Sequence, residues 1–215
     1  MRTEVWQGYL RKACRHKLTT RTFAAFNTNV DVVAHVTNEK LQRLLRANPD
    51  IDMDIVRNRS IDDIKTITSK EDFLVVLKEM LGQGKSFHIV LEGKELMDWL
   101  DKQFPDEKES MGGQAGIIAN QMASLGAMAV VYTPLLSAKQ ASLFDERVTT
   151  PIVTESGIEL EPVRQAARPE DSTKINWIFE YAKGIEIDFG FTKITTPRAN
   201  SVIVAKTAPD KGKTI

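Results

Sequence analysis

The sequence has a single cysteine, no net charge and no long apolar run, and each of these absences excludes a class of protein. One cysteine, Cys14, allows no intrachain disulfide, which favours a reducing compartment. The 29 basic residues balance 29 acidic ones, which argues against a general nucleic-acid or membrane-surface binder. No apolar run approaches the roughly 20 residues that cross a bilayer, and the charged N-terminus lacks the apolar core of a signal peptide. We therefore expect a cytoplasmic globular protein that acts on neither nucleic acid nor membrane.

Two common phosphate-binding motifs are also absent, although a glycine-rich loop is present. The stretch Met111-Gly112-Gly113-Gln114-Ala115-Gly116 opens into an apolar, helix-forming run, but it matches neither a Walker A loop nor Gly-x-Gly-x-x-Gly. Glycine permits positive φ and close approach of a ligand to the main chain, and the first amides of a helix favour an anionic or oxygen-rich ligand. The pattern predicts either a small-molecule pocket at a helix start or simply a tight loop.

A cluster of short polar side chains follows the first apolar segment, Thr22-Phe23-Ala24-Ala25-Phe26, which is a strand by composition. In open α/β sheets, ligands bind at the carboxyl ends of strands. Asn29 and Asp31 alternate, so in an extended chain both side chains point the same way and offer amide and carboxylate groups suited to a polyol. The alternative is an Asx turn, which these residue types also favour.

The remaining pattern is that of an α/β protein with a change of texture after Val148. Apolar spacing predicts helices over Thr3–Leu18, Leu41–Leu45, Ser69–Leu81, Gly93–Phe104, the run after Gly113 and Ala138–Phe144, and strands over Ser86–Leu91 and Ala127–Tyr132. Beyond Val148, we expect a hairpin across Glu155-Ser156-Gly157, then short strands over Trp177–Tyr181, Ile185–Phe189 and Ser201–Ala205. Strand, loop, helix and strand in succession indicate an α/β layer, whereas the second half looks antiparallel.

Several stretches together identify a family resemblance. They are Asn27-Thr28-Asn29-Val30-Asp31, Gly112 to Asn120, Tyr132-Thr133-Pro134 and Lys174-Ile175-Asn176. In these residues, and in their order and spacing, the chain resembles the N-terminal half of the ADP-dependent glucokinase/phosphofructokinase family of the ribokinase-like superfamily. The resemblance covers Phe23 to Ala205, and its most specific part is Gly-Gly-Gln-Ala-Gly.

The resemblance implies a glycolytic sugar kinase that uses ADP as phosphoryl donor, requires Mg²⁺ and acts on a small-molecule sugar or sugar phosphate. It implies an α/β fold with an incomplete ribokinase-like core and a smaller, mostly β lid formed by inserted segments. On this basis we assign residues 1–31 and 111–147 to the core, 32–110 and 148–206 to the lid, and 207–215 to a polar tail.

The resemblance also implies site residues. Asn29, Asp31, Gly112, Gly113 and Gln114 would bind sugar hydroxyls.

From the lid, Lys174 would meet the 6-phosphate of fructose 6-phosphate, where a point charge suits a phosphate. His88 stands where glucose-phosphorylating relatives place a Glu, which favours fructose 6-phosphate over glucose. Read from its strand alone, His88 is instead a structural residue.

The family's catalytic segments are missing from these 215 residues. The family places its catalytic Asp in Gly-x-Gly-Asp, whereas Gly82-Gln83-Gly84 is followed here by Lys85, and the Asn-x-x-Glu segment tied to Mg²⁺ is also absent. Phosphoryl transfer requires metal and an oriented base, so we expect a fragment with no kinase activity of its own. A sheet that lacks its later strands would expose an edge, through which self-association is possible.

Three functions therefore compete. The first is an ADP-dependent kinase present as its sugar-binding half. The second is a non-catalytic sugar-phosphate-binding or interaction module that uses the same pocket, and the third is a structural α/β protein. The third leaves the clustering of polar residues and glycines at strand ends unexplained, and we rank it last.

Overall fold

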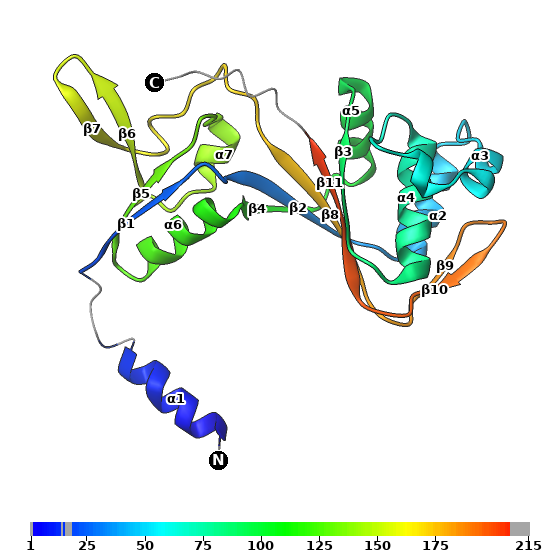
Figure 1. Ribbon diagram of the computed structural model, residues 1–215, viewed down its shortest axis with the longest axis horizontal. Helices are drawn as coiled ribbons and strands as arrows, with labels where there is room; N and C mark the ends of the chain where they lie inside the picture. The colour runs from blue at the N-terminus through cyan, green and yellow to red at the C-terminus, as the bar shows by residue number, and fades with distance from the viewer. Residues whose placement is uncertain (1, 14, 16–18, 207–215) are drawn as a thin grey trace. The chain divides into compact units, whose positions relative to one another are not determined.

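The computed structural model describes residues 2–13, 15 and 19–206, and the chain divides into two compact units (Figure 1). Unit 1 runs to Asn29 and resumes over Met111–Thr173. Unit 2 comprises Val30–Ser110 and the described residues from Lys174 onward. Cys14, the end of the first predicted helix and the polar tail of residues 207–215 lie outside the described residues. No described helix is both long and apolar enough to span a membrane.

Unit 1 is built on a four-stranded sheet in the order β1-β5-β6-β7. Its elements are α1 (Arg2–Ala13), β1 (Arg21–Ala25), α6 (Gln114–Ser124), β5 (Met128–Tyr132), α7 (Ala138–Ser142), β6 (Thr149–Thr154) and β7 (Gly157–Pro162). Strand β5 pairs in parallel with both β1 and β6, and β6 and β7 form the expected antiparallel hairpin. Helix α6 runs beneath β1 and β5 (Figure 1).

One face of this sheet forms the core of unit 1. Ala129 and Val131 of β5 pack on Ala119 and Ala123 of α6, together with Phe144. The small alanines let the helix approach the sheet closely, because they carry nothing beyond Cβ. The alternation of buried and half-exposed residues along β5 is that of a strand with one covered face.

Unit 2 is a five-stranded sheet, ordered β3-β11-β8-β2-β4, with helices on one side (Figure 1). Its strands are β2 (Asn29–His35), β3 (Phe87–Leu91), β4 (Lys108–Gly112), β8 (Ile175–Tyr181) and β11 (Asn200–Lys206), with a separate hairpin of β9 (Glu186–Asp188) and β10 (Lys193–Thr195). Its helices are α2 (Asn38–Ala47), α3 (Met53–Asn58), the short η1 (Ile61–Asp63), α4 (Lys70–Gln83) and α5 (Lys94–Gln103). Two of the strands cross the unit boundary. Strand β2 begins at Asn29, the last residue of the first segment of unit 1, and β4 ends at Gly112, inside the second segment.

Aromatic side chains fill the core between the sheet and the helices of unit 2. The ring of Phe179 lies 5.0 Å from that of Phe73 on α4 and 5.3 Å from that of Phe104, both edge-on. Such edge-to-face pairs add to the burial of apolar area, which is the main stabilising term. The predicted apolar stripe of α4 is confirmed as part of this core.

Both termini of α4 carry capping residues. Ser69 Oγ accepts a hydrogen bond from the amide of Asp72 at 3.1 Å, and Gly84 ends the helix in the left-handed conformation at φ 61°. The carboxylate of Asp72 reaches back to the amide of Thr68 at 3.0 Å, one residue before the cap. Side-chain oxygens of Ser69 and Asp72 therefore accept hydrogen bonds from backbone amides at the start of the helix.

Several elements of the structure were not expected from the sequence. They are strands β2, β4 and β10 and the short helices α3 and η1. The residues from Asn29 onward, expected to form a polar tip, continue as strand β2. Residues 148–173, which we assigned to the lid, group with unit 1 because β6 pairs in parallel with β5. The assignment of core and lid roles to the two units stays a prediction.

Candidate functional site

The residues predicted to bind substrate divide between the two units. Unit 1 holds Asn29 and the glycine loop Gly112-Gly113-Gln114, and unit 2 holds Asp31, His88 and Lys174. Asn29 and Asp31 lie two positions apart in the extended strand β2, so their side chains leave the strand on the same side. Each unit therefore carries part of the predicted set.

In unit 1, the glycine loop packs directly against the turn that follows β1. Gly113 has φ 75° and ψ 144°, a conformation open almost only to glycine. A Cβ on Gly113 would lie 2.4 Å from the carbonyl oxygen of Asn27 and 2.9 Å from Asn29 Oδ1. The same carbonyl accepts a hydrogen bond from the amide of Ala115 at 3.0 Å. Gly113 therefore has to be a glycine, because any side chain would overlap the turn of Asn27 to Asn29.

The turn itself is strained at Phe26. This residue has φ 71°, the one positive φ of a non-glycine residue in the described chain. Its amide donates to the carbonyl of Tyr132 at 2.9 Å, and its ring meets the Tyr132 ring edge-on at 5.6 Å. Backbone strain of this kind clusters at functional sites, where surrounding contacts maintain it.

A buried chain of hydrogen bonds supports the turn from behind. Gln140 Nε2 donates to Thr28 Oγ1 at 2.5 Å, Thr28 donates to Thr133 Oγ1 at 2.7 Å, and Thr133 donates to the carbonyl of Leu135 at 2.9 Å. The three side chains are at most 4% exposed, and Gln140 Oε1 has no partner among the described protein atoms. These hydrogen bonds connect Thr28 in the turn to the carboxyl end of β5 and to α7.

Asn120, the last residue of the glycine-loop motif, has a structural role. Its side-chain amide donates to the carbonyl of Leu143 at 2.9 Å, and its oxygen accepts from the amide of Asp145 at 2.8 Å. It therefore anchors the loop that follows α7 to helix α6. Its place in the family motif does not require contact with a ligand.

In unit 2, the polar residues gather on the sheet face that the helices leave uncovered. Asp31 pairs in register with Asn176, and Asn176 Nδ2 donates to Asp31 Oδ1 at 3.4 Å. The amide of Val30 donates to the carbonyl of Lys174 at 2.8 Å, which fixes Lys174 beside the start of β2. Both Asp31 and Asn176 alternate with buried residues and are themselves half-buried. The structure therefore brings Asp31, Asn176 and Lys174 together.

His88 shares that open face but lies apart from Asp31. The register runs from Asp31 through Asn176 and Ala205 to Val90, which is two residues beyond His88 in β3. Three strand spacings of about 4.8 Å separate β2 from β3, which is roughly 14 Å across the sheet. One hexose ring cannot touch both side chains, so the sheet does not group His88 with the other predicted site residues. His88 is exposed.

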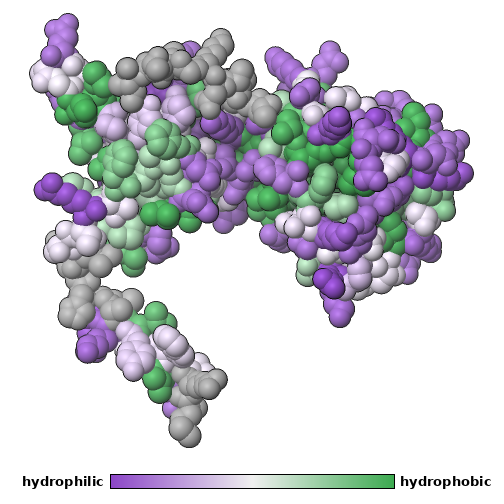
Figure 2. Space-filling view, viewed as in Figure 1, coloured by the Kyte–Doolittle hydropathy of each residue, from purple (hydrophilic) through white to green (hydrophobic). Residues whose placement is uncertain are grey.

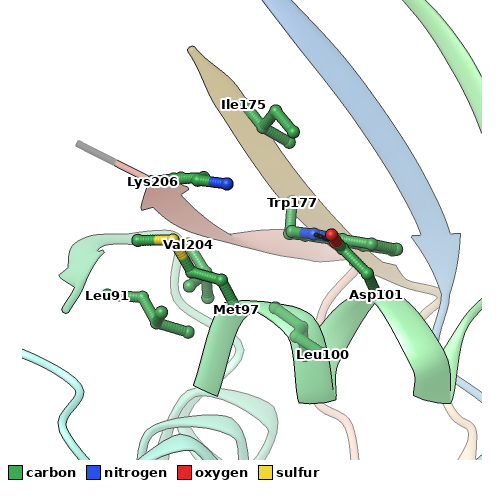
Figure 3. Close-up of a pocket in the computed structure, with 8 residues that line it drawn as sticks. All are labelled: Leu91, Met97, Leu100, Asp101, Ile175, Trp177, Val204 and Lys206. Carbon is green, nitrogen blue, oxygen red and sulfur yellow. Dashed lines mark hydrogen bonds between the residues drawn. The ribbon is translucent and has the colours of Figure 1, made fainter. Parts of the chain in front are cut away.

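The opposite face of this sheet offers no room for a ligand. Figure 3 shows the cavity there, where Trp177, Val204 and Ile175 of the sheet meet Met97, Leu100 and Asp101 of α5. Its volume of about 10 Å³ is scarcely that of one water molecule. The indole nitrogen of Trp177 donates to Asp101 Oδ1 at 3.0 Å, which satisfies the polar groups present. This cavity is therefore too small to hold a sugar.

No group of three or more His, Cys, Asp or Glu side chains within the described residues is arranged to hold a metal ion. Mg²⁺ is commonly held by only one or two carboxylates, together with water and substrate phosphate. The Mg²⁺ that the family resemblance implies therefore stays a prediction.

Comparison with known proteins identifies the family. A family model described as the ADP-specific phosphofructokinase/glucokinase conserved region matches residues 20–210. The chain belongs to this family. An ADP-specific phosphofructokinase from Pyrococcus horikoshii is 35% identical over 184 residues, which are 85% of this chain and 40% of that relative. An ADP-dependent glucose/glucosamine kinase from Pyrococcus abyssi is 28% identical over 183 residues.

Solved structures agree with the sequence comparison. The crystal structure of a hypothetical ADP-dependent phosphofructokinase from Pyrococcus horikoshii OT3 has a TM-score of 0.72 at 34% identity, covering 88% of this chain and 42% of that one. An ADP-dependent kinase in complex with fructose 6-phosphate and ADPβS has a TM-score of 0.70 at 26% identity, covering 95% of this chain and 42% of that one. The fold of this family member is mixed α/β, and its structural neighbours are ribokinase-like ADP-dependent kinases. The chain spans about 40% of the length of the curated relatives it matches.

Two parts of the arrangement were missed by sequence reasoning. Asn176 was noted only as part of a motif, although alternation along an expected strand could have placed it on the same face as a polar partner. The hydrogen bonds that connect Gln140, Thr28 and Thr133 join residues more than 100 positions apart, so no local sequence pattern indicates them.

Proposed function

We propose that this family member supplies the sugar-binding part of a kinase that transfers phosphate from ADP to fructose 6-phosphate. The observation that carries the proposal is the contact between Gly113 and the turn of Asn27 to Asn29, in a chain whose relatives carry the corresponding names. This contact joins the most specific motif of the sequence, the glycine loop, to the polar turn that follows β1.

The predicted site residues of each unit suit a different chemical group of a sugar phosphate. In unit 1, Asn29 and the loop Gly112-Gly113-Gln114 offer an amide side chain and main-chain groups to sugar hydroxyls. A site that hydrogen-bonds the hydroxyl groups of its ligand rejects similar molecules without them, because such molecules leave buried polar groups of the site unpaired.

In unit 2, Asp31 accepts hydrogen bonds from a sugar hydroxyl, and Asn176 orients its carboxylate. Lys174 supplies positive charge to the 6-phosphate, which fructose 6-phosphate has and glucose lacks. His88 is left out of this group because of its distance across the sheet. The preference for fructose 6-phosphate over glucose then depends on Lys174.

Substitution of Lys174 tests this assignment. Lys174→Ala is expected to weaken fructose 6-phosphate binding to the 215-residue chain by at least tenfold and to leave glucose binding unchanged, because only the former carries a phosphate. Isothermal titration calorimetry with both sugars measures the two affinities. Lys183→Ala, which removes an exposed lysine elsewhere in unit 2, is the matched control. Equal losses for the two sugars, or none, would contradict the role of Lys174.

A non-catalytic sugar-phosphate-binding module is the second candidate. It is favoured by the absence of Gly-x-Gly-Asp from these 215 residues, since that segment carries the family's catalytic Asp. For this chain alone, an assay that couples ADP, Mg²⁺ and fructose 6-phosphate to product formation is expected to show no turnover. Turnover above background would exclude the module and would require a catalytic base within residues 1–215.

A further inference from the structure

Unit 1 buries three polar side chains behind the turn of Asn27 to Asn29, although apolar side chains remain on its surface. Figure 2 shows hydrophobic residues on the surface of the β6–β7 hairpin. The buried polar residues are Thr28, Thr133 and Gln140. Burial of a polar group costs free energy unless the group is hydrogen-bonded, so a buried polar cluster is more informative than an exposed apolar residue.

The hydrogen bonds of this cluster can run in only one direction. The carbonyl oxygen of Leu135 can only accept, so Thr133 Oγ1 donates to it at 2.9 Å. The single hydroxyl hydrogen of Thr133 is then used, and Thr28 has to donate to Thr133 at 2.7 Å. Thr28 Oγ1 can therefore only accept from Gln140, whose Nε2 lies 2.5 Å away. The Leu135 carbonyl thus fixes the orientation of the Gln140 amide.

This orientation leaves the other atom of the Gln140 amide unpaired. Gln140 is 0% exposed, and its Oε1 has no hydrogen-bond partner among the described residues. An unpaired buried acceptor destabilises the folded state, because it has given up its hydrogen bonds to water. A leucine is of similar size and has no polar group to leave unpaired. Stability alone therefore does not explain a glutamine at this position, whereas donation to Thr28 does.

The residue that accepts this hydrogen bond lies in the strained turn. Phe26 has φ 71°, and the Thr28 amide donates to the Phe26 carbonyl at 3.1 Å. A non-glycine residue keeps such a conformation only where its surroundings hold it. The Thr28 hydroxyl is held by Gln140 on one side and by Thr133 on the other. The buried hydrogen bonds therefore constrain the turn at its centre.

The groups on either side of Thr28 contact the glycine loop. The Asn27 carbonyl accepts a hydrogen bond from the Ala115 amide at 3.0 Å, and a Cβ on Gly113 would lie 2.4 Å from it. Asn29 Oδ1 would lie 2.9 Å from the same Cβ position. A contact this close tolerates little rotation of the turn. Because Thr28 lies between Asn27 and Asn29, fixing its side chain fixes where both groups meet the loop.

We infer that Gln140 of helix α7 is a positioning residue for the sugar site of unit 1. It acts through the Thr28 hydroxyl and holds Asn29 and the glycine loop in the arrangement that a sugar hydroxyl meets. This role rests on the proposed function, because it assigns Gln140 a part in sugar binding by Asn29 and Gly113. Its effect is on affinity, and the unpaired Oε1 means that the folded state gains little from it.

Gln140→Leu in the 215-residue chain tests this role. The substitution removes both the donor to Thr28 and the unpaired oxygen while it keeps an approximately equal volume. We expect the affinity for fructose 6-phosphate to fall at least tenfold, and the urea midpoint of unfolding to stay the same or rise. Isothermal titration calorimetry and urea denaturation measure the two quantities. A residue that only stabilises the fold would show a lower midpoint and an unchanged affinity of the folded chain.

Variants of Thr28 test whether Gln140 acts through this hydroxyl. Thr28→Val removes the hydroxyl and should weaken binding as much as Gln140→Leu does, whereas Thr28→Ser keeps the hydroxyl and should retain most of the affinity. In a chain that already carries Thr28→Val, adding Gln140→Leu should cause no further loss, since the two residues act as one unit. Additive losses from the two substitutions would show that Gln140 does not act through Thr28.

The matched control lies beyond the other end of α7. Arg164 donates two hydrogen bonds to the Phe144 carbonyl, at 3.1 and 2.7 Å. Arg164→Ala removes both and leaves the side chains behind the turn in place. It is expected to lower the urea midpoint and to leave the affinity for fructose 6-phosphate unchanged. Equal losses of affinity in Arg164→Ala and Gln140→Leu would overturn the positioning role, because any loosening of unit 1 would then have the same effect.

A measurement without sugar separates this role from the proposed function. Hydrogen exchange of the Ala115 amide, which donates to the Asn27 carbonyl, reports the contact between the turn and the glycine loop. We expect exchange to be at least tenfold faster in Gln140→Leu than in the native chain, and unchanged in Arg164→Ala.

The two measurements distinguish the possible failures. If Ala115 exchange rises in Gln140→Leu but the native chain binds no fructose 6-phosphate, the hold of Gln140 on the turn is supported and the proposed function fails. If the native chain binds the sugar and Gln140→Leu binds it equally well, the positioning role is overturned and the proposed function stands. If no sugar binds and Ala115 exchange is unchanged, both are overturned.

Discussion

At the scale of single residues, Gly113 is the position with the least freedom. Its backbone conformation is almost restricted to glycine, and a Cβ would overlap the Asn27 carbonyl. Gly113→Ala is expected to lower the free energy of unfolding by about 1–3 kcal/mol from backbone strain alone, with a further loss from the overlap.

A matched control separates strain from overlap. Gly126 also has a positive φ, 89°, but nothing lies within 4 Å of the position that a methyl group would take there. Urea denaturation of Gly113→Ala and Gly126→Ala should therefore show the larger loss at Gly113. Equal losses would mean that the loop does not press on the turn of Asn27 to Asn29.

Asp145 gives a residue-scale prediction for pH. Hydrogen bonds from the Arg147 side chain, and then from its amide, lower the pKa of Asp145 from 3.8 to about 2. Because the folded pKa lies below the ordinary value, the stability that this pair contributes is fully present above about pH 4 and is lost as pH falls through about 2.

Arg147→Ala should therefore raise the pKa of Asp145 toward 3.8, as measured by NMR titration of its carboxyl carbon. Any stability difference from the native chain should be present at neutral pH and shrink below about pH 4. Arg43→Ala removes an exposed arginine of unit 2 and should leave the pKa of Asp145 unchanged. A pKa of about 2 that persists in Arg147→Ala would assign the shift to another cause.

At the scale of elements, the cap of α4 is the clearest test of a local signal. Ser69→Ala removes the acceptor of the Asp72 amide and is expected to lower the free energy of unfolding by about 1 kcal/mol. Ser69→Thr keeps a hydroxyl and should lose less. Urea denaturation measures both, and a Ser69→Ala chain as stable as the native one would show that the cap contributes nothing.

Sequence reasoning succeeded where the signal is local and failed where it depends on distant pairing. Helix α4 has both an apolar stripe and end signals, and β5 has clear alternation, so both were predicted. Strand β4 reads Lys-Glu-Ser-Met-Gly, with little apolar content, and forms because it pairs with β2 in the sheet. Strand β2 was hidden by its opening polar residues.

The candidate site shows the same division. Asn29 and Gly113 stand in local motifs, and the packing of Gly113 on the Asn27 carbonyl explains the glycine, as a tight loop also would. Their contact with a ligand stays a prediction. The partnership of Asp31 with Asn176 joins residues 145 positions apart, and the distance of His88 from Asp31 depends on the strand order. Neither can be read from spacing along the chain.

At the scale of the whole molecule, two of the crossings between the units lie inside strands, whereas the crossing at Thr173–Lys174 lies just before β8. Strand β2 starts in unit 1 and continues through unit 2, and β4 returns. A change in sequence pattern after Val148 does not reveal which sheet a strand joins. In the structure β6 pairs in parallel with β5 in unit 1, and the core and lid roles stay a prediction.

The central claim is that the turn at the start of β2 and the glycine loop bind one and the same sugar phosphate. Titration of the ¹⁵N-labelled chain with fructose 6-phosphate, followed residue by residue by NMR, tests it most directly. We predict that the amides of Asn29 and Gly113, both in unit 1, shift together and give one dissociation constant, whereas those of α3 do not move. A Gly113 amide that stays unmoved while Asn29 responds, or two unequal constants, would contradict the account.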